Sequence, residues 1–412
     1  MNKIYKNLII FIIFSIILLN ILSFLLLDGF YIRSDWGIGE YLINYSNGFL
    51  RRGLLGSFYL DLYNYNPLFL DYAVYIKILA IILLLYLITK DLNFYSKALI
   101  FLIPSGILFF SVDINTTVQN FYRKELLIYF FYFLYIFILF KNNFFIKQKK
   151  KYLLITVIFL LLNYSLIFYH EATLFFSIPS LITVIIFQNK LLEIKKMNKY
   201  FFFYVIICLV TLLFIILKKT LITNINLLDY LGQLELKKTI LEPVKMMAHF
   251  SFDDHVNMLI SSIHYLAVSF ISFLFFFIIY TLSFFLILNI KKNYFDLRVY
   301  LFTILIVTTS SFPLFLLGWD YGRWYYSVFI HSMIMLIYIY KVHEKKNIFK
   351  YYRYKNLIYK NKISPKEENL IVMFLLFISL NVNFGHCCGD VIKLDMLILI
   401  AKKLQQISLL FL

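Results

Sequence analysis

Apolar runs long enough to cross a lipid bilayer recur along almost the whole chain, and they limit its fold more than any other feature. A helix needs about 20 apolar residues to cross the hydrocarbon layer. We predict eleven such spans, over residues 8–27, 72–89, 96–112, 126–140, 153–169, 173–187, 201–217, 266–290, 299–318, 326–340 and 370–384. Hydrophobic residues make up 62% of the chain, far more than in a soluble domain. The sequence therefore predicts an all-α, polytopic integral membrane protein.

The first span sets the predicted topology. Lys3 and Lys6 precede it and no small-residue cleavage site follows it, so we expect a retained helix with a cytoplasmic N-terminus. Alternation from there places 25 of the 40 Lys and Arg residues in cytoplasmic segments and 14 in outer segments. This is the positive-inside bias of a multi-pass membrane protein.

We expect one transmembrane domain over residues 1–384. It includes a long outer loop over 218–265, whose spacing fits amphipathic helices, and a basic inner loop over 341–369. The polar tail over 385–412 is either disordered or an amphipathic outer helix.

The net charge of +18 lies mostly in short lysine loops at the inner face, where anionic membrane lipids are the nearer partner. A nucleic-acid partner is therefore not expected. The three cysteines form neither a metal-binding spacing nor a disulfide framework, and no Gly-rich nucleotide loop is present. Asp253, Asp254 and His255 cannot all point at one ion from a regular helix. We expect no cofactor and no metal.

Arginine is concentrated on the predicted outer side. Five of the seven arginines fall in outer segments, namely Arg33, Arg51, Arg52, Arg123 and Arg323. A guanidinium group presents a planar fork of donors that matches phosphate, so this distribution indicates an anion site. Arg51 and Arg52, flanked by Leu50 and Leu54, fit at headgroup depth. They bind either a specific lipid-linked phosphate or ordinary lipid headgroups.

Two further arginines begin predicted spans. Arg123 precedes the span over 126–140, where a cation opposes the helix dipole and is tolerated best beside an anion. The neighbouring Glu125 either neutralises a cation there or acts in catalysis. Arg323 follows Asp320 by three positions, so the two can pair on one helix face. Trp319 and Trp324 beside them fit either the interfacial aromatic belt or a surface that stacks on sugar rings.

Three residues are candidate proton acceptors at the outer face. His170 and Glu171 occupy a short turn between the spans over 153–169 and 173–187, and Asp320 lies before the span over 326–340. A neutral histidine can abstract a hydroxyl proton near pH 7. A purely structural histidine at the turn fits the sequence equally well.

These features together resemble those of the Wzy-type O-antigen polymerases. The resemblance rests on the multispan profile, Arg51-Arg52, Asn120 with Arg123 at the start of a span, and the long late outer loop. More loosely, the chain resembles membrane glycosyltransferases with a GT-C-like helical fold and an outer-face cavity. The resemblance implies transfer of a glycan from undecaprenyl diphosphate to a lipid-linked repeat unit at the periplasmic face. It also implies a location in the bacterial inner membrane and a chain-length regulator protein as a candidate partner.

Two alternatives stay open from the sequence. A GT-C glycosyltransferase with a polyprenyl-phosphate-sugar donor would use a carboxylate of the first outer segment, Asp35 or Glu40. A flippase or transporter for lipid-linked oligosaccharides would carry ionisable groups near the bilayer midplane. Lys77 is the one clear charge inside a predicted span, which favours chemistry at the outer face.

Overall fold

The computed structural model describes residues 35–43, 53–101, 123–141, 148–192, 194, 198–221, 252–289, 297–317, 321–346 and 370–375. All regular elements within these ranges are helical, as predicted. Along the chain they are α2 (Asp35–Leu42), α3 (Gly56–Tyr65), α4 (Pro67–Thr89), α5 (Phe94–Phe101), α7 (Glu125–Lys141), α8 (Lys149–Tyr169), the 3₁₀ helix η4 (Glu171–Leu174), α9 (Ser177–Leu192), α10 (Asn198–Leu221), α13 (Phe252–Asn289), α14 (Leu297–Leu317) and α15 (Tyr321–Lys346).

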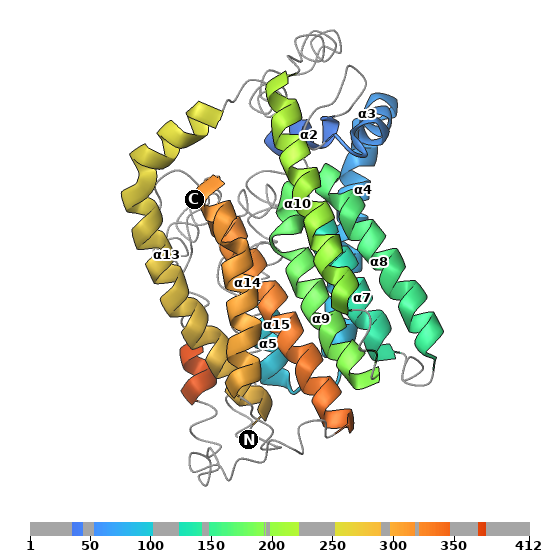
Figure 1. The fold of residues 1–412 in the computed structure, drawn as a ribbon, viewed down its shortest axis with the longest axis vertical. Coiled ribbons are helices and arrows are strands. Elements are labelled where there is room, and N and C mark those ends of the chain that lie inside the picture. Colours follow the sequence, from blue (N-terminus) through green and yellow to red (C-terminus); the bar gives the residue numbers. More distant parts are fainter. Residues whose placement is uncertain are drawn as a thin grey trace, which may run out of the picture.

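The long helices lie side by side in a bundle, and the short helices α2 and α3 lie at one end of it (Figure 1). We call this the α3 end. Local sequence explains how the first long helix begins there. The Asn66 side chain accepts a hydrogen bond from the Leu68 amide at 2.9 Å, and Pro67 occupies the first helical position. Both are favourable signals for a helix start.

Helices α7 and α15 run in the same direction through the centre of the bundle. Tyr129 of α7 hydrogen-bonds Ser327 of α15. About three turns farther along both helices, the ring of Phe140 stacks on that of Tyr338, with 5.8 Å between the ring centres. Arg123, which precedes α7, pairs with Glu40 of α2, so both helices begin at the α3 end. Helix α8 runs back toward this end, and η4 and α9 follow its last residue. This alternation of helix direction agrees with the predicted topology, in which residues 170–172 and the starts of α7 and α15 lie on the same side of the membrane.

Within the described residues, four helices are long and apolar enough to cross a membrane, namely Pro67–Thr89, Lys149–Tyr169, Glu171–Asn189 and Trp324–Val342. Shorter apolar helices cover Tyr200–Ile215, Phe270–Phe285 and Tyr300–Leu314. All seven coincide with predicted spans. These helices support a membrane protein. The count of eleven spans and the outer-face cavity stay predictions, because the run over 8–27 and most of those over 96–112 and 370–384 lie outside the described residues.

Helices α13 and α15 extend farthest beyond their predicted spans. Helix α13 begins at Phe252, inside the segment predicted as the outer loop over 218–265. Asp253 and Asp254 fall in its first turn, where acidic residues are favoured by the helix dipole. Helix α15 continues to Lys346, six residues into the predicted inner loop over 341–369. The tail over 385–412 lies outside the described residues.

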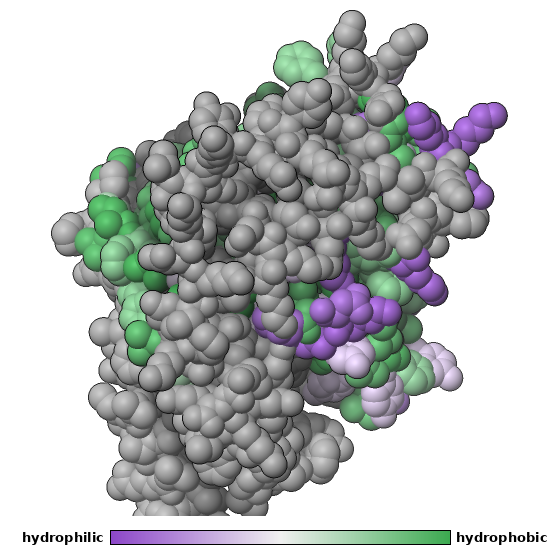
Figure 2. All heavy atoms as spheres, turned by 90° about the horizontal axis from the view of Figure 1, so that it is seen from below, coloured by the Kyte–Doolittle hydropathy of each residue, from purple (hydrophilic) through white to green (hydrophobic). Residues whose placement is uncertain are grey.

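Burial separates the central helices from the peripheral ones. The apolar stretch of α15 is 83% buried, whereas that of α4 is 39% buried and exposes large side chains such as Ile76 and Leu79. A bilayer would cover such apolar faces. At the end opposite α3, hydrophilic side chains gather between apolar ones (Figure 2). Exposed lysines at the ends of α7 and α8 include Lys141, Lys149, Lys150 and Lys151.

Candidate functional site

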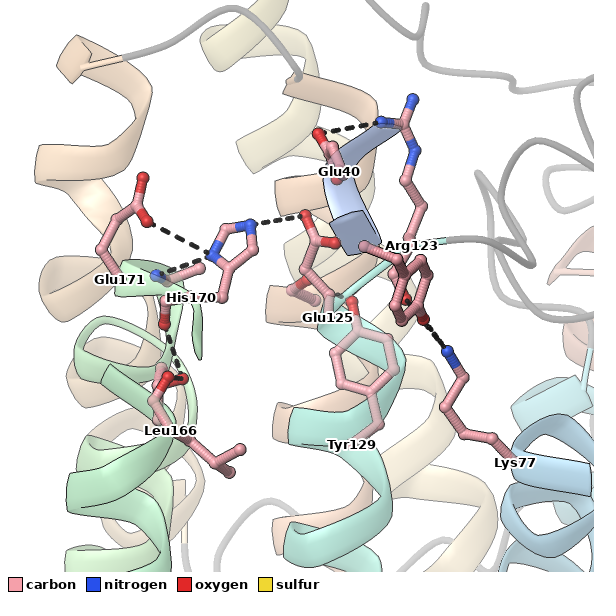
Figure 3. Close-up of polar contacts among 12 residues, drawn as sticks. Glu40, Lys77, Arg123, Glu125, Tyr129, Leu166, His170 and Glu171 are labelled. Carbon is pink, nitrogen blue, oxygen red and sulfur yellow. Dashed lines mark hydrogen bonds and ion pairs between the residues drawn. The ribbon is translucent and has the colours of Figure 1, made fainter. Parts of the chain in front are cut away.

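Charged side chains from four segments converge at the α3 end of the bundle. Arg123, just before α7, pairs with Glu40 of α2, with Nη1 3.7 Å from Oε1. Glu125, the first residue of α7, faces His170 at the end of α8, with 3.5 Å between Oε1 and Nε2 (Figure 3). All four residues are at least 94% buried. Buried charges interact strongly with one another because little water screens them.

The backbone holds the His170 ring in one orientation. His170 has extended backbone angles after α8 and caps η4, where its Nδ1 accepts a hydrogen bond from the Ala172 amide at 3.1 Å. A nitrogen that accepts an amide proton carries none itself, so the neutral ring bears its proton on Nε2. That proton faces Glu125. Glu171 lies on the other side, 3.9 Å from Nδ1, which is too long for a hydrogen bond.

The carbonyl oxygen of Arg123 ties this site to the neighbouring helices. It accepts hydrogen bonds from the Tyr41 hydroxyl at 3.3 Å and from Lys77 Nζ at 3.5 Å. Lys77 also donates to the Tyr41 hydroxyl. Burial raises the pKa of Tyr41 well above its usual value, and the nearby Tyr59 raises it further. Tyr41 therefore stays a neutral hydrogen-bonding group, and it fixes α2 against α4 and α7.

Lys124 adds a third cation to the site. Its side chain is fully buried, and Nζ lies 5.0 Å from the centre of the Tyr169 ring. An aromatic face attracts a cation at this distance. Lys77, Arg123 and Lys124 thus lie at the same end of the bundle as Glu40, Glu125, His170 and Glu171. We call these seven residues the charged cluster.

A tight turn brings a further segment to the cluster. The Leu54 amide donates to the carbonyl oxygen of Phe168, near the end of α8, at 3.5 Å. The adjacent Leu55 has a φ of 66°, in the left-handed region that bulky residues rarely adopt. This turn follows Arg51 and Arg52 in the sequence. Both arginines lie outside the described residues.

The candidate residues of α15 are only partly described. Tyr129 and its partner Ser327 lie one turn beyond Glu125 and Arg323, respectively, so the parallel helices bring the backbone of Arg323 to the level of Glu125. The Arg323 side chain is outside the described part of the chain, as are Trp319 and Asp320. Trp324 is buried, with 6% of its surface exposed.

Asp35, the other candidate carboxylate of the first outer segment, is the first residue of α2, but its side chain is not described.

The structure therefore brings together Glu40, Arg123, His170 and Glu171 among the residues predicted from sequence. It adds Lys77, Lys124 and Tyr41, which sequence reasoning did not assign to the site. The signal available for Lys77 was its charge inside an apolar run. Tyr41 carries no such signal, because its role depends on a contact with residues far away in sequence. Within the described residues, no group of three His, Cys, Asp or Glu side chains is arranged to hold a metal ion.

Comparisons with protein-family models, with curated proteins and with solved structures found no match for this chain. The class that the structure supports is therefore a helical membrane protein with a buried charged cluster at one end of its bundle.

Proposed function

We propose that the chain is a membrane glycosyltransferase, and more specifically a surface-polysaccharide polymerase of the bacterial inner membrane. In this proposal the α3 end faces the periplasm. The substrate is an undecaprenyl-diphosphate-linked glycan, and the acceptor is a lipid-linked repeat unit. The observation that carries the proposal is the buried Glu125–His170 pair beside Arg123 at one end of the bundle. It supports the proposal because the pair could accept a proton and the guanidinium group could bind phosphate.

The cations would bind the diphosphate group of the donor during the reaction. A diphosphate leaving group gains negative charge as its bond to the sugar breaks, and fixed guanidinium groups stabilise that charge. Arg123 would bind it, joined by Lys77 and Lys124. Arg51, Arg52 and Arg323 complete the proposed diphosphate site, and Trp319 would stack on the sugar. Trp324, predicted for the same role, is instead buried in the core of the bundle. Extra arginines are needed because the guanidinium group of Arg123 already pairs with Glu40.

Glu125 is the favoured base. The lone pair of His170 Nδ1 is engaged by the Ala172 amide, and its Nε2 bears the proton in the neutral ring, so His170 is poised to donate. The acceptor hydroxyl attacks the anomeric carbon and gives its proton to Glu125. The carbon–oxygen bond to the diphosphate breaks, and the diphosphate leaves with the bonding electrons. His170 positions the Glu125 carboxylate, and Glu171 and Asp320 are secondary candidates.

The geometry favours this enzyme over the transferase that uses a monophosphate-linked donor. That alternative needs a carboxylate of the first outer segment, Asp35 or Glu40, as its catalytic group. Glu40 instead pairs with Arg123, so its position is explained by holding the guanidinium group in place. A chain-length regulator protein remains a proposed partner.

Gene deletion followed by complementation tests the proposal. Cells without the gene should carry surface glycans capped with a single repeat unit, and the wild-type gene should restore long chains. The Glu125→Gln variant should leave single repeats although the protein reaches the membrane in normal amount. The matched control is Asp91→Asn, which changes an exposed carboxylate at the opposite end of α4. Long chains in the deletion strain would refute the proposal.

A further inference from the structure

A second buried polar site lies deeper in the bundle, around His331 of α15. The His331 side chain is fully buried in the middle of the span Trp324–Val342. Its Nδ1 donates to the carbonyl oxygen of Ser327 at 2.8 Å in the neutral ring. The other ring nitrogen, Nε2, has no hydrogen-bond partner among the described residues. An ionisable side chain within a membrane span usually marks a functional site, because it is costly to keep there.

An alternative explanation for His331 is that buried polar side chains only hold the helices together through hydrogen bonds. The rings of Tyr132 and Tyr129 lie 4.7 Å and 5.5 Å from the His331 ring, and Phe176 lies on another side at 6.1 Å. None of the three carries a charge near neutral pH. Tyr132 is fully buried, yet its hydroxyl has no hydrogen-bond partner in the described part of the chain either. Hydrogen-bonded packing therefore does not explain this pair.

Further buried polar side chains lie on either side of this site along the bundle. Toward the α3 end, Tyr129 hydrogen-bonds Ser327 and lies one turn from Glu125. Toward the opposite end, three hydrogen-bonded pairs follow: Tyr135 with Thr156 at 3.1 Å, Tyr338 with Gln188 at 2.6 Å, and Tyr152 with Asn189 at 3.1 Å. Tyr152 lies one residue beyond the exposed lysines at the start of α8.

We propose that these side chains line a hydrated proton path across the bundle and that His331 is its proton-carrying group. Water molecules would satisfy Nε2 of His331 and the Tyr132 hydroxyl, since buried water typically makes about three hydrogen bonds to such groups. His331 accepts a proton at Nε2 from a hydronium ion on one side and returns it to water on the other. The imidazole is unchanged after each transfer. This activity is separate from glycan transfer.

Proton flux into vesicles tests the path directly. The full chain is reconstituted into liposomes that contain a pH-sensitive dye, and a potassium diffusion potential drives protons inward without any lipid-linked glycan. We expect wild-type vesicles to acidify several times faster than protein-free vesicles. His331→Phe should lower the rate to that of protein-free vesicles. Tyr132→Phe, which removes only a hydroxyl without a described hydrogen-bond partner, should keep the fold and slow the flux.

The matched control is Tyr204→Phe. Tyr204 donates to the Leu160 carbonyl at 2.8 Å between α10 and α8, away from the path, so its loss should leave the flux unchanged. Wild-type flux equal to that of protein-free vesicles would overturn the inference. So would flux that is the same in wild type and in both His331→Phe and Tyr132→Phe. Because no glycan is present, either result leaves the proposed polymerase to be judged separately.

Discussion

Nε2 of His170 lies 3.5 Å from Oε1 of Glu125, and both side chains are almost completely buried. The two residues come from opposite ends of the α7–α8 hairpin in sequence, and the antiparallel course of these helices brings them together. The backbone amide of Ala172 donates a hydrogen bond to Nδ1, the other ring nitrogen, and so fixes the orientation of the imidazole. One histidine therefore connects the backbone of a tight turn to the carboxylate that we propose as the base.

Glu125→Gln should reduce glycan polymerisation about 10²- to 10⁴-fold, the range typical for loss of a general base. The amide keeps the size of the side chain but cannot take up a proton at the pH of the reaction. Chain length on a polysaccharide gel measures the effect. Glu171→Gln is the comparison, because Glu171 is farther from the ring and makes no hydrogen bond to it. Equal losses in both variants would argue against Glu125 as the base.

His170→Asn should separate the two roles of this residue. An asparagine can still accept the Ala172 amide proton and cap η4, so thermal stability should stay near that of wild type. It lacks the ring N–H that faces Glu125, so polymerisation should fall. His170→Ala should lose the cap as well, at a cost of about 1 kcal/mol in the free energy of unfolding. Full activity of the asparagine variant would mean that the histidine is purely structural.

Leu55→Gly should not destabilise the protein, although glycine usually does. A left-handed backbone costs a residue with a Cβ about 1–2 kcal/mol, and glycine avoids this cost. Leu55 is exposed and has a φ of 66°. Leu55→Val should lower the melting temperature because a β-branched side chain tolerates this conformation even less. The opposite order of melting temperatures would show that the side-chain contacts of Leu55 outweigh its backbone strain.

Lys341→Met should destabilise the end of the bundle opposite α3 by about 1–3 kcal/mol. Lys341 Nζ donates to the Ile88 carbonyl at 2.8 Å and to Asp91 at 3.2 Å, and so connects α15 to the end of α4. Asp91 is exposed, so the ion pair itself contributes little. Asp91→Asn should therefore have a small effect on the melting temperature. A larger effect of Asp91→Asn than of Lys341→Met would contradict this assignment.

Hydropathy predicted the positions of the helices well, because burial in lipid or protein requires the same apolar runs that mark them in the sequence. It predicted helix ends less well. Helix α13 begins at Phe252, before its apolar run, because ordinary polar residues each cost a helix only about 0.7 kcal/mol or less relative to alanine. The predicted span over 266–290 covered only the apolar part of α13.

The candidate site was predicted in part for a similar reason. Arg123, His170 and Glu171 stand out because they are charged or titratable residues at the ends of apolar runs. Tyr41 and Lys124 look like ordinary interfacial residues in the sequence. Only the packing of the helices shows that Tyr41 contacts Lys77 and that Lys124 lies against the ring of Tyr169. His331 also sits in an apolar run with several tyrosines. Its burial against α7 could not be read from hydropathy.

Binding of undecaprenyl diphosphate to the purified protein tests the proposed anion site most directly. Native mass spectrometry or a fluorescent competitor can compare wild type with Arg123→Lys, which keeps the charge but loses the planar fork, and with the control Lys141→Ala at the opposite end of α7. Loss of a charge-assisted hydrogen bond costs about 1.5–3 kcal/mol, so Arg123→Lys should weaken binding about 10- to 100-fold. Lys141→Ala should bind as wild type does. Equal affinities for all three proteins, or no binding by wild type, would contradict a phosphate site at the α3 end.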